Sequence, residues 1–202
     1  MKGPAAPRPS HARGGPLQRG RPAPHVAVRL LTEDDAPALA ALLVANRDFL
    51  APWDAARPEE YRTEEFQRRD AARLLELHRQ GAVLPGVVVL DGEVVGRINV
   101  NDVVRGAFLS GHLGYWVAEH VTGRGVATAA VAAMTRTAFG DAGLHRLQAA
   151  TLLHNAASRR VLERNGFTPI GVAPRYLRIA GRWQDHLLFQ LLADEAPTGD
   201  LR

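Results

Sequence analysis

A junction of strand, glycine loop and helix at residues 113–128 places the strongest constraint on the fold of this chain. The segment reads LGYWVAEHVTGRGVAT, with glycines at 123 and 125 before a helical pattern rich in alanine and valine. The first amides of a helix lack partners within the helix, and with the helix dipole they form an anion-binding site. Glycine lets a backbone approach a ligand closely, and Arg124 adds positive charge. The junction suits a pyrophosphate, although a plain tight turn uses the same residues.

Two common phosphate-binding loops do not fit this junction. A dinucleotide fingerprint needs three glycines in G-x-G-x-x-G, and Gly123, Gly125 and Ala127 do not supply them. A Walker loop needs a Gly-Lys-Ser/Thr end, and the only lysine of the sequence is Lys2. If the loop binds a phosphate, it therefore belongs to a fold other than the dinucleotide-binding and Walker types.

The elements around the junction predict α/β architecture of the mixed (α+β) kind, in the order β-α-α-β-β-β-α-β-α-β-β. Thr32 with Asp35 marks the first helix start, and Asp91-Gly92 supplies a tight hairpin turn. Helices are expected at Ala36–Arg47, Glu59–Gln80, Gly125–Phe139 and Asn155–Asn165. Strands are expected at Val26–Leu31, Val87–Leu90, Glu93–Val100, Phe108–Ala118, Arg146–Leu153, Phe167–Ala173, Tyr176–Ile179 and Trp183–Leu192.

The net charge of +4 belongs to the N-terminal segment. Residues 1–24 carry five basic and no acidic side chains, whereas the rest of the chain carries 20 basic and 21 acidic ones. Rich in Pro, Gly and Arg, this segment is expected to be a disordered tail, followed by one domain at 25–194 and a short tail at 195–202. The tail is either a solvated extension or an arm that contacts ribosomal RNA weakly. No apolar run is long enough to cross a membrane, and the absence of cysteine fits a cytoplasmic protein.

The segment V-T-G-R-G-V-A-T resembles motif A, (Q/R)-x-x-G-x-(G/A), of the GNAT superfamily of N-acetyltransferases. The match places Thr122 where the family usually has Gln or Arg. Two further segments resemble its RimJ/RimL branch, and RimJ most: H-N-A-A-S-R-R-V-L-E-R-N-G-F from His154 to Phe167, and N-R-D-F-L-A-P-W from Asn46 to Trp53. Shorter matches are D-V-V-R-G-A-F from Asp102, L-G-Y from Leu113 and G-R-W-Q-D-H from Gly181. Together they cover residues 26–192.

The resemblance implies a GNAT fold that binds acetyl-CoA as co-substrate and needs no metal. Its mixed sheet would have six to seven strands, splayed at the cofactor, and about four flanking helices. Pantetheine would lie in the splay, with Tyr115, Trp116 and Val117 on one wall and Leu152 to Asn155 on the other. The expected cofactor-binding residues are Tyr115, Trp116, Val117, Thr122, Gly123, Arg124, Gly125, Val126, Ala127, Thr128, Asn155, Ser158 and Arg164.

The resemblance also implies direct attack of an amine on the thioester. A backbone amide near Val117 would stabilise the oxyanion, and Ser158 would hydrogen-bond the leaving thiolate, although both Asn155 and Ser158 equally suit the first turn of a helix. The base is unassigned, because the usual glutamate position is Ile170: either a water relay leads to another carboxylate or there is no dedicated base. Asp102, Glu119 and Asp185 are candidates that are more often structural, and Phe49 and Trp53 would line the acceptor pocket or the core. His112, His145, His154 and His186 lack metal-ligand spacing.

Three functions follow from these expectations. The first is acetylation of a protein N-terminus, such as the alanine or serine of a ribosomal protein, whose α-amine is neutral in useful amounts at cellular pH. The second is acetylation of a small amine: an antibiotic, a polyamine or an amino acid. The third is a non-catalytic acyl-CoA sensor or ribosome-associated factor. An open acidic acceptor groove would favour the first and a closed pocket the second; the sequence leaves the protein a monomer or a homodimer.

Overall fold

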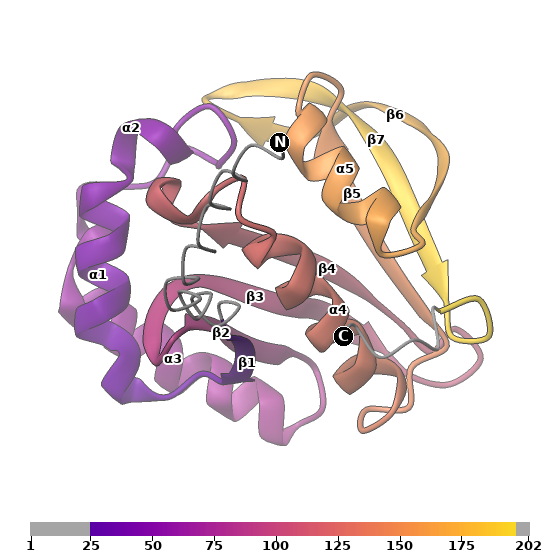
Figure 1. Cartoon of the computed structure of the whole chain (residues 1–202), viewed down its shortest axis with the longest axis horizontal. Helices are drawn as coiled ribbons and strands as arrows, with labels where there is room; N and C mark the ends of the chain where they lie inside the picture. The colour runs from indigo at the N-terminus through magenta and orange to yellow at the C-terminus, as the bar shows by residue number, and fades with distance from the viewer. Residues whose placement is uncertain (1–24, 197–202) are drawn as a thin grey trace, which may run out of the picture.

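The computed structural model describes residues 25–196, which form a seven-stranded sheet with helices on both faces (Figure 1). The strands are β1 (Val26–Leu30), β2 (Leu84–Leu90), β3 (Glu93–Val104), β4 (Ser110–Val117), β5 (Arg146–Leu152), β6 (Thr168–Ile179) and β7 (Arg182–Leu192). The α-helices of the described residues are α1 (Ala36–Ala45), α2 (Arg47–Leu50), α3 (Glu64–Arg79), α4 (Val126–Phe139) and α5 (Ala156–Arg164). The mixed α/β class and the six to seven strands expected from the family resemblance are confirmed.

The two faces of the sheet carry different helices, as alternation along β2 shows. Val88 belongs to a core that includes Val131 and Met134 of α4, whereas Val87 belongs to a second core with Leu39 of α1 and Leu74 of α3. Successive side chains of a strand point to opposite faces, so α4 covers one face while α1 and α3 cover the other. In Figure 1 α4 crosses in front of β3 and β4, and α5 follows on the same side. Below, these are called the α4 face and the α3 face.

The sheet opens between its fourth and fifth strands. Its order is β1-β2-β3-β4-β5-β7-β6, and all neighbours are antiparallel except β4 and β5. These two parallel strands pair only where Ser110–His112 meets Arg146–Gln148, although each strand continues beyond that point. The splay predicted from the family resemblance is therefore present, and it leaves backbone groups of β4 available to a ligand.

Several boundaries differ from the sequence prediction for local reasons. The first predicted helix, Ala36–Arg47, ends at Ala45 because Asn46 leaves the helical conformation, with φ of −107° and ψ of 18°; the short helix α2, which the sequence did not predict, follows it. The second begins with a separate turn, and Thr63 then caps α3 by accepting from the Phe66 amide at 3.2 Å. The two strands predicted at 167–179 form one strand, β6, with a bulge between Ala173 and Leu177.

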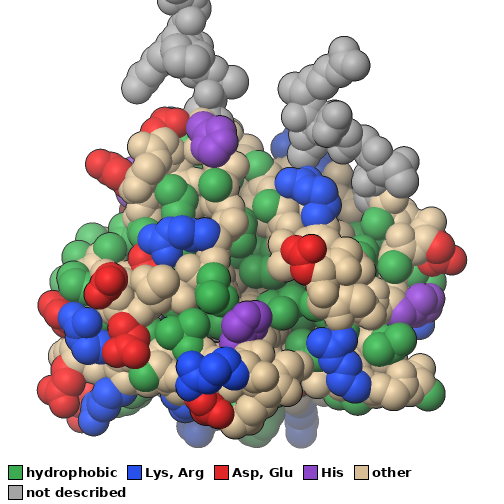
Figure 2. All heavy atoms as spheres, turned by 90° about the horizontal axis from the view of Figure 1, so that it is seen from below, with side chains coloured by type: hydrophobic (Ala, Val, Ile, Leu, Met, Phe, Trp, Pro, Cys, Tyr) green, Lys and Arg blue, Asp and Glu red, His purple; other side chains and the backbone are tan. Residues whose placement is uncertain are grey.

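The surface of the described domain carries charges of both signs. Basic and acidic side chains are interspersed on the face in Figure 2, with hydrophobic groups between them. This pattern agrees with the near-neutral balance of the chain after residue 24. In the described part of the chain, no helix is both long and apolar enough to cross a membrane. The predicted N-terminal tail and residues 197–202 lie outside the described residues.

Candidate active site

A cleft of about 530 Å³ occupies the splay between β4 and β5. It runs from the loop before α4, past α5, to side chains of α2 and the β6–β7 hairpin. The residues that line it are Phe49, Leu50, Trp53, Tyr115, Trp116, Val117, Val121, Thr122, Gly123, Gly125, Val126, Ala127, Thr128, Ala150, Thr151, Leu152, Asn155, Ala157, Ser158, Arg160, Val161, Arg164, Leu177, Ile179 and His186. With the exception of the exposed Arg124, every cofactor-binding residue expected from the sequence lies in this lining.

The loop before α4 fits a phosphate through its backbone. Gly123 and Gly125 have φ angles of +72° and +79°, which favour glycine, and a Cβ at either position would enter open space. Gly125 is the N-cap of α4, so the first amides of that helix border the same space. The Thr122 hydroxyl donates to the Glu119 carbonyl at 2.7 Å, so this departure from the family motif serves to hold the loop.

Backbone amides of β4 point into the splay. The Ala118 amide donates to the Val95 carbonyl of β3 at 2.8 Å. Successive amides of a strand point to opposite edges, so the Val117 amide faces the open side, towards the diverging β5. The same holds for Tyr115, two residues earlier. These amides are suitably directed to bind pantetheine or the oxygen of a thioester.

Ser158 of α5 is held against Tyr115 of β4. Asn155 caps α5 by accepting from the Ser158 amide at 3.0 Å, and the Ser158 hydroxyl lies 2.9 Å from the Tyr115 hydroxyl. Burial raises the pKa of Tyr115 to about 12, and the hydrogen bond with Ser158 opposes this only in part. Tyr115 is therefore protonated at neutral pH, and the pair can donate a proton into the cleft. The sequence identified Ser158 but not this partnership.

Two buried asparagines join the walls of the cleft. Asn46 follows α1, and its side chain donates to the Leu42 carbonyl and accepts from the Glu119 amide, both at 2.8 Å. It thereby fixes the segment that leads into the glycine loop. Asn165 donates to the carbonyls of Val161 at 2.8 Å and Thr128 at 3.3 Å, which ties α5 to α4. Asn46 belongs to the motif N-R-D-F-L-A-P-W, but nothing in the sequence indicated that it contacts Glu119, 73 residues away.

The three acidic candidates for the base lie outside the cleft lining. Asp102 is an exposed residue 3.7 Å from His112, Glu119 lies in the turn before the glycine loop, and Asp185 accepts from the Arg175 amide at 2.8 Å in the β6 bulge. Leu153 and His154, expected on the second wall, line a separate surface pocket instead. Strand β5 ends at Leu152, and the wall of the cleft therefore stops there and resumes at Asn155.

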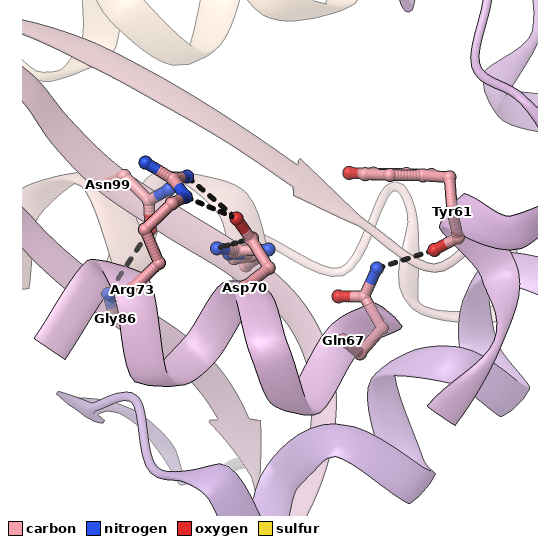
Figure 3. Close-up of polar contacts among 7 residues, drawn as sticks. Tyr61, Gln67, Asp70, Arg73, Gly86 and Asn99 are labelled. Atoms are coloured by element: carbon pink, nitrogen blue, oxygen red, sulfur yellow. Dashed lines mark hydrogen bonds and ion pairs between the residues drawn. The ribbon is translucent and has the colours of Figure 1, made fainter. Parts of the chain in front are cut away.

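A polar pocket of about 440 Å³ adjoins the cleft on the α3 face, and Trp116 lines both cavities. Asp70 of α3 is at its centre, accepting from Arg73 at 2.7 Å and from the buried Arg97 of β3 at 2.9 Å (Figure 3). Burial raises the pKa of Asp70, but the hydrogen bonds from Arg73 and Arg97 outweigh it and hold that pKa below its usual value. The Asp70 carboxylate is therefore ionised, and Arg73 and Arg97 balance its negative charge.

Among residues 25–196, no group of three or more His, Asp or Glu side chains could hold a metal ion. The histidines named from the sequence are dispersed: His112 is on β4, His145 precedes β5, His154 follows it and His186 is on β7. Of these four, only His186 lines the cleft.

Fold and cleft define an acetyl-CoA-dependent acetyltransferase, and residues 25–168 match the family model described as "Acetyltransferase (GNAT) domain". The chain belongs to this family. It is 34% identical over 176 residues to the [ribosomal protein uS5]-alanine N-acetyltransferase of Escherichia coli K12, covering 86% of this chain and 91% of that enzyme. Acetyl-CoA is the co-substrate, and the open glycine loop with the β4 amides fits it.

Solved structures agree with this assignment. The Mycobacterium smegmatis RimJ in complex with CoA-disulfide matches with a TM-score of 0.83 and 36% identity, covering 86% of this chain and 85% of that one. The ribosomal-protein-S5-alanine acetyltransferase of Vibrio fischeri matches with a TM-score of 0.81 and 32% identity, covering 86% and 96%. The resemblance to the RimJ/RimL branch is thus confirmed.

Proposed function

We propose that the protein transfers the acetyl group of acetyl-CoA to the N-terminal α-amine of a protein, with the alanine or serine terminus of a ribosomal protein as its substrate. The observation that carries this proposal is the likeness to a uS5-alanine acetyltransferase over 91% of that enzyme's length. Such a substrate is met in the cytoplasm, which is the location we propose for the enzyme. The basic N-terminal segment would contribute at most a weak contact with ribosomal RNA.

The acceptor side of the cleft supports a small apolar first residue. Phe49 and Trp53 of the α2 region and Leu177 and Ile179 of β6 line it, and its lining within residues 25–196 contains no Asp or Glu. A basic side chain would lose hydration here without gaining an acidic partner. An acidic groove would have favoured a ribosomal protein with a basic N-terminus, and the described cleft is not acidic. The proposal is supported instead by the size and the polarity of the side chains that line the acceptor side.

The residues of the cleft have distinct roles in the proposed reaction. The loop at 122–128 holds the pyrophosphate, and the β4 amides orient the thioester, with the Val117 amide accepting the developing oxyanion charge. The amine nitrogen forms a bond to the thioester carbonyl carbon, and the carbon–sulfur bond breaks. Ser158, backed by the protonated Tyr115, donates a proton to the leaving thiolate.

A thiol-release assay tests the proposal. Peptides that begin with Ala or Ser should be acetylated, and the same peptides with an acetylated N-terminus should be inert even when they contain an internal lysine. Faster turnover of polyamines, aminoglycosides or free amino acids would instead support a small-molecule acetyltransferase. Binding of CoA without turnover of any amine would support a non-catalytic role.

A further inference from the structure

The proposed reaction needs a group that receives a proton from the attacking amine, and the cleft offers few candidates. Apart from the hydroxyls of Ser and Thr, the side chains of the lining that can exchange a proton or carry a charge are Tyr115, Arg160, Arg164 and His186. A guanidinium remains protonated at any physiological pH. Tyr115 has a pKa of about 12 and is paired with Ser158, so it is a donor. His186 is the remaining group.

The hydrogen bond of His186 leaves one ring nitrogen available. Its Nδ1 lies 2.9 Å from the Gln184 carbonyl oxygen, which can only accept, so Nδ1 carries the hydrogen in the neutral ring. Nε2 then presents a lone pair, and no residue within 25–196 forms a hydrogen bond to it. The Tyr176 ring, 5.7 Å away between centroids, packs beside the imidazole. The side chain is 3% exposed, so its orientation is well fixed.

His186 lies on the α3 face of the sheet. Along β7, Phe189 and Leu191 pack in the core beneath α4, and residues separated by an odd number of positions point to opposite faces. His186 therefore points away from α4 and α5, to the side where Phe49 and Trp53 line the cleft. Ser158, on α5, lies on the other side. An amine entering from the α3 face would meet His186, whereas the departing sulfur would meet Ser158.

We infer that His186 is the catalytic base of this acetyltransferase, a role that rests on the proposed function. As the amine nitrogen bonds to the carbonyl carbon, Nε2 takes one of its protons; as the carbon–sulfur bond breaks, the sulfur takes a proton from Ser158 and leaves as the thiol. His186 then returns its proton to solvent, and the Ser158–Tyr115 pair regains one. A neutral imidazole suits this role because the lone pair on Nε2 can accept a proton from the amine nitrogen.

Two substitutions at this position separate a chemical role from a structural one. His186→Ala removes the ring, whereas His186→Asn keeps an amide that can donate to the Gln184 carbonyl but cannot act as a base. We expect both variants to lose about a hundredfold in kcat with an N-terminal alanine peptide, while calorimetry gives an unchanged affinity for acetyl-CoA. Added imidazole should restore at least part of the His186→Ala turnover and leave the wild-type enzyme unaffected. The control His145→Ala, at an exposed position outside the cleft, should be fully active.

Each outcome decides whether His186 has a chemical role or only a structural one. Full activity of His186→Asn would overturn the inference, because the hydrogen bond would then be all that His186 provides. Loss of acetyl-CoA affinity in both variants would also overturn it in favour of a structural role. Either result leaves the proposed function standing so long as the wild-type enzyme acetylates peptides. A wild-type enzyme that acetylates no amine would overturn the proposed function and this role with it.

Discussion

The two sides of the cleft are built from different parts of the polypeptide. On the α4 face, one continuous segment at 122–128 forms the glycine loop that we propose as the phosphate site, and the groups it offers are backbone amides. On the α3 face, the walls come from α2, β4, β5, β6 and β7, and the groups that matter are side chains such as Trp53 and His186. A site made of backbone amides tolerates changes in side chains as long as the path of the backbone is kept. A site made of side chains from five elements depends on the identity of every side chain and on the position of every element.

The largest effect is expected from Gly125→Glu, which places a carboxylate in the space of the phosphate loop. The like charge and the strained φ of +79° together should cost several kcal/mol and weaken acetyl-CoA binding on the order of a thousandfold. The matched control is Gly106→Glu, because Gly106 has a φ of +71° and open space around its Cβ but lies outside the cleft. Equal affinity of the two variants by calorimetry would refute the phosphate site.

The second prediction concerns Asp70, in the polar pocket on the α3 face. Asp70→Asn leaves the buried Arg97 without its ion pair and should lower the free energy of unfolding by about 3 kcal/mol, with acetyl-CoA affinity unchanged. Asp70→Leu with Arg97→Met should recover most of that loss in urea denaturation. Because the folded pKa of Asp70 lies below the ordinary value of about 3.9, its contribution is complete above that pH and is lost as pH falls through the folded pKa. The difference between wild type and Asp70→Asn should therefore vanish in strong acid.

The third prediction tests the pair of hydroxyls formed by Ser158 and Tyr115. Ser158→Ala should lower kcat roughly a hundredfold, near the low end of general acid catalysis, because a thiolate is a good leaving group. Tyr115→Phe should lower kcat less, because Ser158 keeps its own proton. Both should bind acetyl-CoA almost as the wild type does, since the Asn155 cap and the backbone cradle remain. Unchanged turnover in both variants would exclude this pair as the proton donor.

The smallest effect is expected from removal of residues 1–24. The family match begins at residue 25, and the described residues that line the cleft lie between Phe49 and His186. Acetylation of free peptides should then be within about twofold of the full-length rate, because the binding groups are unchanged. A larger loss of kcat/KM on peptides would show that a third region contributes to the site.

Most of the cofactor-binding residues expected from the sequence line the cleft. Glycines before a helix have a local physical meaning, so Gly123, Gly125 and the α4 start could be interpreted without knowledge of distant residues. Ser158 and Asn155 followed from the family resemblance, and the structure places both on the cleft. The acceptor side was predicted less well: Asp102, Glu119 and Asp185 were named as candidate bases, and the described cleft includes none of them.

What the sequence determined by itself was the order of the elements, the mixed α/β class and the phosphate loop, because each depends on residues close together in the chain. Only the tertiary structure decided that Tyr115 meets Ser158, that Asn46 fixes the segment before the glycine loop, and that His186 lines the cleft. Those contacts join residues far apart in the chain: Tyr115 and Ser158 are separated by 43 positions, and Asn46 and Glu119 by 73. No periodicity or local propensity records such distances, since they are set by how the sheet and its helices pack.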